Sequence, residues 1–274
     1  NKMQFPIGKG IKEIMIGCYA QGTHNIVSTE DCCIQHAANN QVSQAVKEAA
    51  EKLEISIYSE ATGQGVLRHI VSRVGAHSNE VMAVLVTASE KMPHQEALIE
   101  FLRGKVPGLV SIAQNINLKP GNVILGHKTK LLWGKKTIVD SMGDFSFHIS
   151  PRSFFQVNTK QAEVLYQQAV RYALLTGTET VIDAYCGTGT ISLFLAKAAK
   201  KVYGIEVVPE TINDARKNAQ DNQVENVEFI VGDAVEVMPN MLQKGIRPDV
   251  IVVDPPRAGC EQTVLDAFIE MQPK

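Results

Sequence analysis

The stretch Asp183-Ala-Tyr-Cys-Gly-Thr-Gly-Thr190 decides the fold class, because it joins a short apolar run to a helical pattern. The run Thr180–Tyr185 has the length and β-branched content of a buried strand, and Ile191–Ala199 has helical periodicity. Between them, Gly187 and Gly189 permit a tight turn and a close approach of the backbone to a ligand. This order of strand, glycine turn and helix indicates one βα unit of a parallel sheet.

The same alternation continues on both sides of this stretch. Further elements are expected at Thr159–Leu175 (helix), Lys201–Val207 (strand), Pro209–Asn222 (helix), Val227–Val231 (strand), Val235–Gln243 (helix), Pro248–Asp254 (strand) and Glu261–Met271 (helix). Such alternation predicts a doubly wound, Rossmann-like α/β fold, in which helices cover both faces of a parallel sheet.

Residues 1–143 differ from this pattern, because they mix short β-rich runs with fewer helices. A helix is expected from Asn39 to Leu53, where Val42, Val46 and Ala49 recur on one face. The other expected elements are a helix at about His94–Arg103 and strands at Ile11–Tyr19, Gly65–Val74, Val81–Thr87, Leu109–Asn115 and Val123–Gly126. This mixture indicates a smaller α+β domain at 1–143, followed by the α/β domain at 144–274.

The composition supplies ample apolar residues for packed cores: 45% of residues are hydrophobic and 20% are charged. The net charge of −2 does not indicate a nucleic-acid-binding protein, so any such surface must be a local patch. No apolar run reaches the ~18 residues that a membrane span needs. The five scattered cysteines fit a reducing compartment better than a disulfide framework. We therefore expect a cytoplasmic protein with no membrane partner.

Acidic residues follow two of the expected strands of the α/β domain. In an open parallel sheet, ligands bind beyond the carboxyl ends of the strands. Glu206 ends the second strand, where its carboxylate can accept hydrogen bonds from both ribose hydroxyls of an adenosine. Asp233 follows the third strand, where it can bind an adenine amino group. Each acid can instead cap the helix that follows it, and this alternative stays open.

The motif Asp254-Pro-Pro-Arg257 follows the fourth strand, and it distinguishes between a nicotinamide cofactor and S-adenosylmethionine. Its two prolines fix the backbone where an acceptor base would arrive, and they hold Asp254 between cofactor and acceptor. Nicotinamide dehydrogenases do not need this arrangement, and Ser192 replaces the third glycine of their G-x-G-x-x-G turn. The combination favours methyl transfer from S-adenosylmethionine over hydride transfer.

Together these motifs resemble those of the RNA (uracil-5-)-methyltransferases. The matching segments are Tyr19-x-x-x-Thr23-His24-x-Ile26-Val27, Asp31-Cys-Cys-Ile-Gln-His36, Ser150-Pro-Arg-Ser-Phe-Phe-Gln-Val-Asn158, Asp183-Ala-Tyr-Cys-Gly-Thr-Gly-Thr190, Gly204-Ile-Glu206, Gly232-Asp-Ala234 and Asp254-Pro-Pro-Arg-Ala-Gly259. The resemblance covers most of the chain. It implies a class I S-adenosylmethionine-dependent methyltransferase fold and transfer of a methyl group to carbon 5 of a uridine in RNA. The segment Asp31–His36 resembles the branch that acts on 23S ribosomal RNA.

The resemblance also implies cofactor contacts and a metal ligand. The implied cofactor contacts are Gln156, Tyr185, Glu206 and Asp254, with Gly187 and Asp233 in addition. In the ribosomal-RNA branch, a cysteine matching Cys32 is the fourth ligand of a 4Fe–4S cluster. Such a cluster needs four cysteines or close equivalents. Cys32, Cys33 and Cys18 cannot supply that set, so we expect the cluster only in a longer protein.

The implied reaction needs a thiolate, which attacks carbon 6 of uracil and makes carbon 5 nucleophilic enough to accept the methyl group. Cys186 lies inside the cofactor loop and Cys260 follows the Asp-Pro-Pro-Arg turn too closely, so neither suits this role. The family places the nucleophile after a fifth strand. We therefore expect it beyond Lys274, in a longer protein of which this chain is a central part, inactive alone. Asp254 and Arg257 are expected to support the reaction by binding the base and its developing enolate oxygen.

Several alternatives stay open. Enzymes that methylate an exocyclic nitrogen of a nucleobase also carry Asp-Pro-Pro, although an aromatic residue typically replaces Arg257. A catalytically silent RNA-binding module is another reading, with Lys128–Lys136 either as its phosphate-contacting run or as a solvated face. Further basic and aromatic candidates in this region include Lys9, Lys12, Arg68, His69, Arg73 and Trp133. Transfer RNA is the alternative to ribosomal RNA as substrate.

Overall fold

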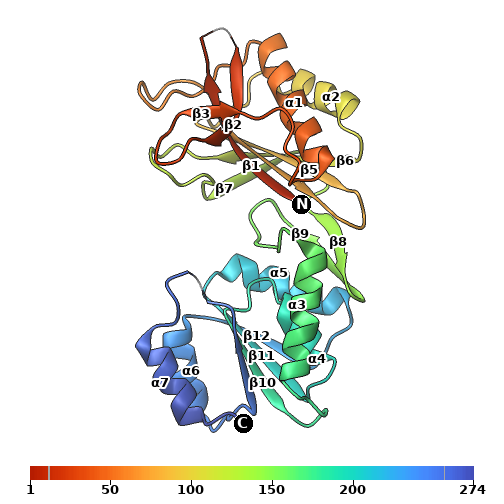
Figure 1. The fold of residues 1–274 in the computed structure, drawn as a ribbon, viewed down its shortest axis with the longest axis vertical. Coiled ribbons are helices and arrows are strands. Elements are labelled where there is room, and N and C mark those ends of the chain that lie inside the picture. Colours follow the sequence, from red (N-terminus) through yellow and green to blue (C-terminus); the bar gives the residue numbers. More distant parts are fainter. Residues whose placement is uncertain (12, 256) are drawn as a thin grey trace. The chain divides into compact units, whose positions relative to one another are not determined.

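The chain forms two compact units (Figure 1). The computed structural model describes residues 1–11, 13–255 and 257–274. The units consist of Asn1–Ser141 with Ile149–Arg152, and of Met142–His148 with Ser153–Lys274. The division between them falls within the hairpin of β8 (Ile138–Met142) and β9 (Phe145–Ile149). Among the described residues, no helix is long and apolar enough to cross a membrane.

The first unit contains a seven-stranded sheet with the order β3-β2-β1-β4-β5-β6-β7. Its strands are β1 (Lys2–Lys9), β2 (Ile14–Tyr19), β3 (Ile26–Ser28), β4 (Leu67–Val74), β5 (Val81–Thr87), β6 (Leu109–Ile116) and β7 (Lys128–Gly134). Neighbouring strands are antiparallel except for the pair β5–β6. This parallel pair requires a crossover, which α2 (Gln95–Lys105) provides.

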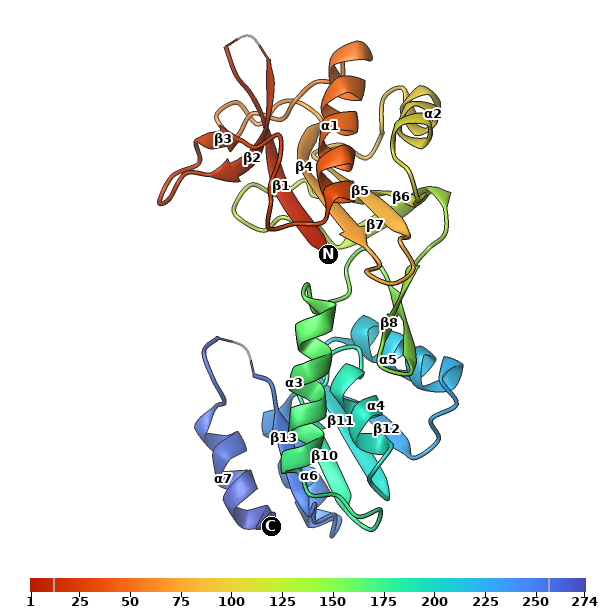
Figure 2. The same ribbon diagram turned by 45° about the vertical axis from the view of Figure 1, so that its right-hand side comes forward.

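Two helices cover one face of this sheet. Figures 1 and 2 show α1 (Ala37–Lys52) and α2 side by side over it. The ring of His36 caps α1 by accepting a hydrogen bond from the backbone nitrogen of Ala38, at 3.2 Å. The predicted apolar stripe of α1 is buried, and it shares a core with Leu98 and Leu102 of α2 and with the strands below.

The sequence prediction was wrong for one strand of this unit and missed three strands of its seven-stranded sheet. The segment Val123–Gly126 is not a strand, because asparagine side chains take its backbone hydrogen bonds. Asn117 donates to the carbonyls of Val123 and Ile124, at 2.5 and 3.1 Å, and the Asn115 side chain binds both backbone groups of Gly126. The missed strands of this sheet are β1, β3 and β7. Lysines on β7, at the edge of the sheet, obscured its strand pattern.

The second unit contains a four-stranded sheet with the order β12-β11-β10-β13, and all of its pairs are parallel. The strands are β10 (Thr180–Ala184), β11 (Lys201–Glu206), β12 (Val227–Val231) and β13 (Val250–Val253). This confirms the predicted α/β fold class. From β10 the chain passes to β11 and β12 on one side, and then crosses to β13 on the other. The strand order therefore reverses between β10 and β13, where such sheets bind ligands.

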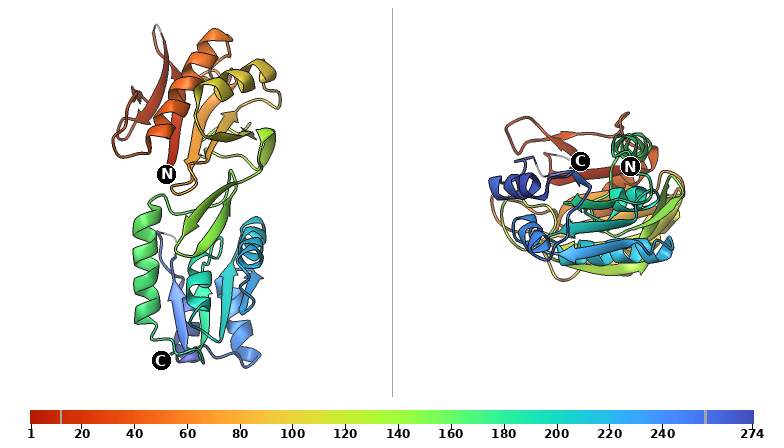
Figure 3. Two further views of the ribbon diagram at one scale, coloured as in Figure 1. Left: turned by 90° about the vertical axis from the view of Figure 1, so that its right-hand side faces the viewer. Right: turned by 90° about the horizontal axis from the view of Figure 1, so that it is seen from below.

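Helices cover both faces of the parallel sheet. They are α3 (Thr159–Tyr172), α4 (Thr190–Ala196), α5 (Pro209–Asp221), α6 (Ala234–Gln243) and α7 (Gln262–Met271). Met238 of α6 and Val264 of α7 share a core with Ile182 of β10 on one face. On the other face, Leu195 next to Val181 forms a second core, to which α3 contributes. Figure 1 shows α6 and α7 on one side of the strands, and Figure 3 shows α3 running along the sheet.

Candidate functional site

A cavity lies at the carboxyl ends of β10 and β13, where the strand order reverses. It is lined by Phe154, Phe155, Gln156, Tyr166, Asp183, Tyr185, Cys186, Gly187, Thr188, Thr190, Ile191 and Asp254. Four of the six cofactor-binding residues predicted from the sequence are in this lining: Gln156, Tyr185, Gly187 and Asp254. The fold therefore brings the end of β10, the end of β13 and the segment before α3 to one place.

The turn after β10 is built from residues with left-handed backbone conformations: φ is +67° at Tyr185, +54° at Gly187 and +78° at Gly189. A Cβ atom at Gly189 would lie 2.6 Å from the Cζ atom of Phe229, so this glycine allows the loop to pack closely. A Cβ atom at Gly187 would meet no atom within 4 Å. Gly187 therefore faces open space at the cavity, as a position for close ligand approach must. Tyr185 adopts this conformation without being glycine, which concentrates backbone strain at the site.

Asp183 is a buried member of the lining to which the sequence gave no role. Its side chain is 1% exposed, and the hydroxyl of Ser192 donates a hydrogen bond to its Oδ2 atom at 2.5 Å. Burial raises the pKa of this carboxyl to about 7, and the nearby charges of Asp254 and Glu206 act in the same direction. Its position at the end of a buried strand, just before the glycine turn, was the available signal.

The segment before α3 forms a second wall of the cavity. Tyr166 of α3 is buried and hydrogen-bonded to the side chain of Gln156, and burial raises the pKa of its hydroxyl to about 12. The hydroxyl of Thr188 donates to the carbonyl of Phe154 at 3.4 Å, which joins this segment to the glycine loop. Asn158 caps α3 by accepting from the backbone nitrogen of Gln161. Gln156 is thus held between a helix start and the glycine loop.

Glu206 ends β11 and is half-buried, and Asp233 follows the neighbouring strand β12 and is exposed. Oε1 of Glu206 accepts from the backbone nitrogen of Val208 at 3.0 Å, which closes the turn before α5. Oδ1 of Asp233 accepts from the backbone nitrogen of Val235 at 3.0 Å and caps α6. Asp233 thus has the helix-capping role that the sequence left open, whereas Glu206 does not cap α5, whose N-cap residue is Val208. Each also lies at the carboxyl edge of the sheet.

The motif after β13 places Asp254 at the cavity. Asp254 is exposed, Pro255 is half-buried and Arg257 is exposed. Pro256, the second proline of the predicted motif, lies outside the described residues. Asp254 follows β13, which pairs directly with β10, so its carboxyl group faces the same cavity as Asp183.

The cysteines do not resemble an activated nucleophile or a metal centre. Cys186 is buried, and burial with the charges of Asp183 and Glu206 raises the pKa of its thiol far above the ordinary value. Cys260 is hydrogen-bonded to Tyr185. The backbone of Cys32 is held by Asn40 at 3.4 Å. Within the part of the chain that the structure describes, no group of three or more His, Cys, Asp or Glu residues can hold a metal ion, so these residues do not fit a 4Fe–4S cluster.

The basic run Lys128–Lys136 is largely paired with acidic residues of its own unit. Lys128 lies 2.8 Å from Oε2 of Glu90, and Lys130 donates to the backbone carbonyl of Glu90 at 2.9 Å. Lys135 forms an ion pair with Glu80. Phosphate groups would have to compete with these carboxylates. The positive charge of this strand is therefore smaller than its sequence indicates.

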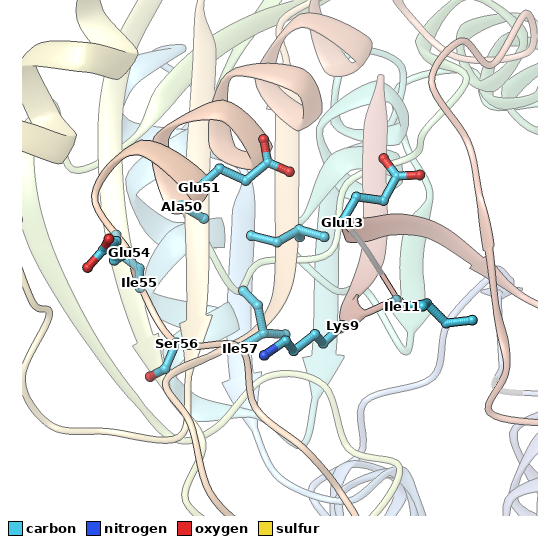
Figure 4. Close-up of a pocket in the computed structure, with 11 residues that line it drawn as sticks. Lys9, Ile11, Glu13, Ala50, Glu51, Glu54, Ile55, Ser56 and Ile57 are labelled. Atoms are coloured by element: carbon cyan, nitrogen blue, oxygen red, sulfur yellow. The ribbon is translucent and has the colours of Figure 1, made fainter.

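Another cavity, of about 420 Å³, lies in the first unit beside the end of α1 (Figure 4). The carboxylates of Glu13, Glu51 and Glu54 line it, together with Lys9. Lys12, a basic candidate from the sequence, lies outside the described residues. The described lining carries more negative than positive charge, which disfavours a phosphate ligand.

Comparison with known proteins first defines the class of the second unit. Residues 175–272 match the family model of a methyltransferase domain. The α/β fold, with its parallel sheet and a cavity at the carboxyl edge, is that of class I S-adenosylmethionine-dependent methyltransferases.

Particular relatives extend the similarity over the whole chain. It is 51% identical over 273 residues to an uncharacterized RNA methyltransferase of Halalkalibacterium halodurans and 50% identical over 274 residues to one of Clostridium tetani. Each match covers 100% of this chain and 60% of the relative, so the chain spans about 60% of the length of these relatives. The chain is also similar to the solved tRNA (uracil-54, C5)-methyltransferase of Pyrococcus abyssi in complex with S-adenosyl-L-homocysteine. That match has a TM-score of 0.80 and 27% identity, and it covers 100% of this chain and 64% of the other.

Proposed function

We propose that this chain is part of an S-adenosylmethionine-dependent RNA methyltransferase that modifies carbon 5 of a uridine in 23S ribosomal RNA. The observation that carries the proposal is the cavity at the β10–β13 reversal, where Gln156, Tyr185, Gly187 and Asp254 come together. Similarity over the whole chain to RNA methyltransferases, and to one enzyme named for uracil carbon 5, supports the choice of acceptor.

The residues of the cavity suit the cofactor. S-adenosylmethionine carries cationic sulfonium and ammonium groups, and the carboxyl groups of Asp183 and Asp254 line the cavity. Gly187 leaves open space that a side chain would fill. We assign ribose binding to Glu206 and adenine binding to Asp233, with Gln156 and Tyr185 as further contacts. When bound, the cofactor supplies an activated methyl group.

Asp254 and Arg257 are placed to serve the acceptor base. The exposed carboxylate of Asp254 lies at the mouth of the cavity and can accept a hydrogen bond from a uracil edge. Arg257, three residues further, can stabilise negative charge on a uracil oxygen. The reaction at carbon 5 calls for a cysteine thiolate that adds to carbon 6. Cys186 is unsuited to this role because burial keeps its thiol protonated.

We assign RNA contact to the first unit. The two candidate substrates are 23S ribosomal RNA and tRNA. The Asp31–His36 segment, which resembles the ribosomal-RNA branch, favours 23S RNA. The similarity to an enzyme named for tRNA favours tRNA as the second candidate. Incubating the full-length protein with labelled S-adenosylmethionine and each RNA separates them. 5-Methyluridine in 23S RNA supports the proposal, its appearance only in tRNA favours the second candidate, and an N-methylated base contradicts both.

The cofactor assignment is tested by calorimetric titration of the chain with S-adenosylhomocysteine. We expect binding, and a loss of at least about tenfold in affinity in Glu206→Ala, because two ribose hydrogen bonds are removed. Glu228→Ala is the matched control, since Glu228 lies on β12 and pairs with Lys201 at 3.1 Å. Absence of binding by the folded chain contradicts the proposed function.

A further inference from the structure

Asn218 of α5 is a buried amide whose two polar ends bind different segments of the second unit. Its side chain is 1% exposed. Its Oδ1 atom accepts from the backbone nitrogen of His148 in β9 at 3.1 Å, and its Nδ2 atom donates to the backbone carbonyl of Thr188 at 3.1 Å. One side chain thus joins the hairpin strand β9 to the glycine loop after β10.

Both of these partners lead directly to walls of the candidate cofactor cavity. Thr188 lines the cavity and follows Gly187. Phe147, next to His148 in β9, has its ring 5.6 Å from that of Phe155, which also lines the cavity. The hydroxyl of Thr188 also donates to the carbonyl of Phe154 at 3.4 Å, so the glycine loop is bonded directly to the segment that contains Phe155.

Asn222 makes a similar contact without reaching the glycine loop. It lies four residues after Asn218, on the same side of the helix. Its Oδ1 atom accepts from the backbone nitrogen of Ser146 at 2.8 Å, and its Nδ2 atom donates to the carbonyl of Ser146 at 2.7 Å. The two asparagines therefore hold β9 against α5 as a neighbouring strand would, but only Asn218 also holds the loop.

We propose that Asn218 is a positioning residue for the cofactor, which fixes the spacing between the glycine loop and the wall supported by β9. This inference rests on the proposed function of the cavity. The site requires a side chain with an acceptor on one end and a donor on the other, because a backbone N–H faces one end and a carbonyl the other. An apolar replacement would remove both bonds and would leave the buried carbonyl of Thr188 without this donor.

The test measures S-adenosylhomocysteine affinity and the apo unfolding temperature of the wild-type chain and three variants. Asn218→Ala is expected to weaken binding about tenfold or more, because the loop loses its anchor. Asn218→Ser keeps a hydroxyl that can bond one of the two partners but cannot span both. We therefore expect it to lose affinity, but less than Asn218→Ala does, and to perturb the fold less. Asn222→Ala is the matched control: it is expected to lower the unfolding temperature but to leave affinity within about twofold.

The outcomes separate this inference from the proposed function. A wild-type chain that does not bind S-adenosylhomocysteine removes the proposed function, and the inference with it. A wild-type chain that binds, with Asn218 variants that bind equally well, overturns the inference alone. Equal affinity losses in Asn218→Ala and Asn222→Ala also overturn it, because the effect would then follow from loosening β9 and not from the loop.

Discussion

The two sheets of this protein place their polar residues differently. In the parallel sheet, the strands are mainly apolar and the acids Asp183 and Glu206 come at or near their carboxyl ends. In the seven-stranded sheet, β4 is buried along its whole length although it contains Arg68 and Arg73. A polar residue therefore has a different structural role in each sheet, and the residue type alone does not show which role it has.

Some buried polar residues of the first sheet hold loops in place. Arg68 donates to the carbonyls of Asn117 and Lys119, at 2.7 and 2.8 Å, and Gln114 donates to Thr87 and to the carbonyl of Ser89. Irregular segments need partners for their backbone groups, and these side chains supply them. In the second sheet the acids instead lie at an edge with a cavity. Position along a strand therefore separates structural from ligand-facing polar residues in this protein.

The largest effect is expected in the glycine turn of the second unit. Gly189→Ala combines a positive φ with a Cβ atom 2.6 Å from Phe229, and should destabilise the unit by about 3 kcal/mol or more. Gly187→Ala meets no protein atom and should cost only about 1 kcal/mol, but its methyl group enters the cavity and should reduce S-adenosylhomocysteine affinity more than stability. Urea denaturation and calorimetry measure both quantities. Equal stability losses would show that the close packing at Gly189 is unimportant.

The next largest effect should fall on the first unit alone. Arg68→Met removes two hydrogen bonds to loop carbonyls and the contact of the guanidinium with the Tyr58 ring, 4.6 Å away. We expect a loss of about 2–4 kcal/mol, because the buried carbonyl of Asn117 and the part-buried carbonyl of Lys119 lose a charged donor. Arg103→Met is the control, since Arg103 is exposed above the ring of Trp133, and should cost about 1 kcal/mol or less. A loss of cofactor affinity in Arg68→Met would contradict a purely structural role.

The sequence predicted the second unit better than the first for a physical reason. In a parallel sheet the strands are apolar and the helices alternate with them, so periodicity marks each element. Of the acids predicted at the strand ends, Asp254 lines the cavity, whereas Glu206 and Asp233 are not among its lining residues. In the first unit, the buried polar residues of β4 and the lysines of β7 break that periodicity. The strand predicted at Val123–Gly126 does not form, because the side chains of Asn115 and Asn117 take the hydrogen bonds of its backbone groups.

Some site residues could not be assigned a role from the sequence, because their roles depend on tertiary neighbours. Asp183 is part of the glycine-turn motif in the sequence. Its raised pKa follows from its burial, and only the structure shows this burial and the hydrogen bond from Ser192. Tyr166 lies in a helix whose sequence gives no sign of the Gln156 contact. Asn218 is one of several amides in a polar helix, and its two partners lie far away in the chain. Such roles follow from the approach of segments that share no local pattern.

A smaller effect is expected from the buried carboxyl group of the second unit. Its folded pKa of about 7 lies above the ordinary value of 3.8, so the folded state binds the proton more tightly. Stability should therefore be highest below the ordinary pKa and fall as the pH rises toward 7. Between pH 5 and 7, Asp183→Asn should gain about 2 kcal/mol relative to the wild type, because it cannot ionise. Denaturation at several pH values measures the difference, and parallel curves would show that Asp183 has an ordinary pKa.

The smallest effect on stability is expected from the surface charges of the first unit. Glu90 lies 2.8 Å from Lys128 and 3.5 Å from Lys130, and all three side chains are substantially exposed. Glu90→Gln should leave the unfolding midpoint unchanged, because exposed ion pairs contribute little. If β7 contacts RNA phosphates, the same variant should bind RNA a few-fold more tightly, with a steeper dependence on salt, since both lysines lose a competing carboxylate. Filter binding over a range of salt concentrations measures this. Unchanged affinity and slope would identify the run as a solvated face, and would place RNA contact elsewhere on the protein.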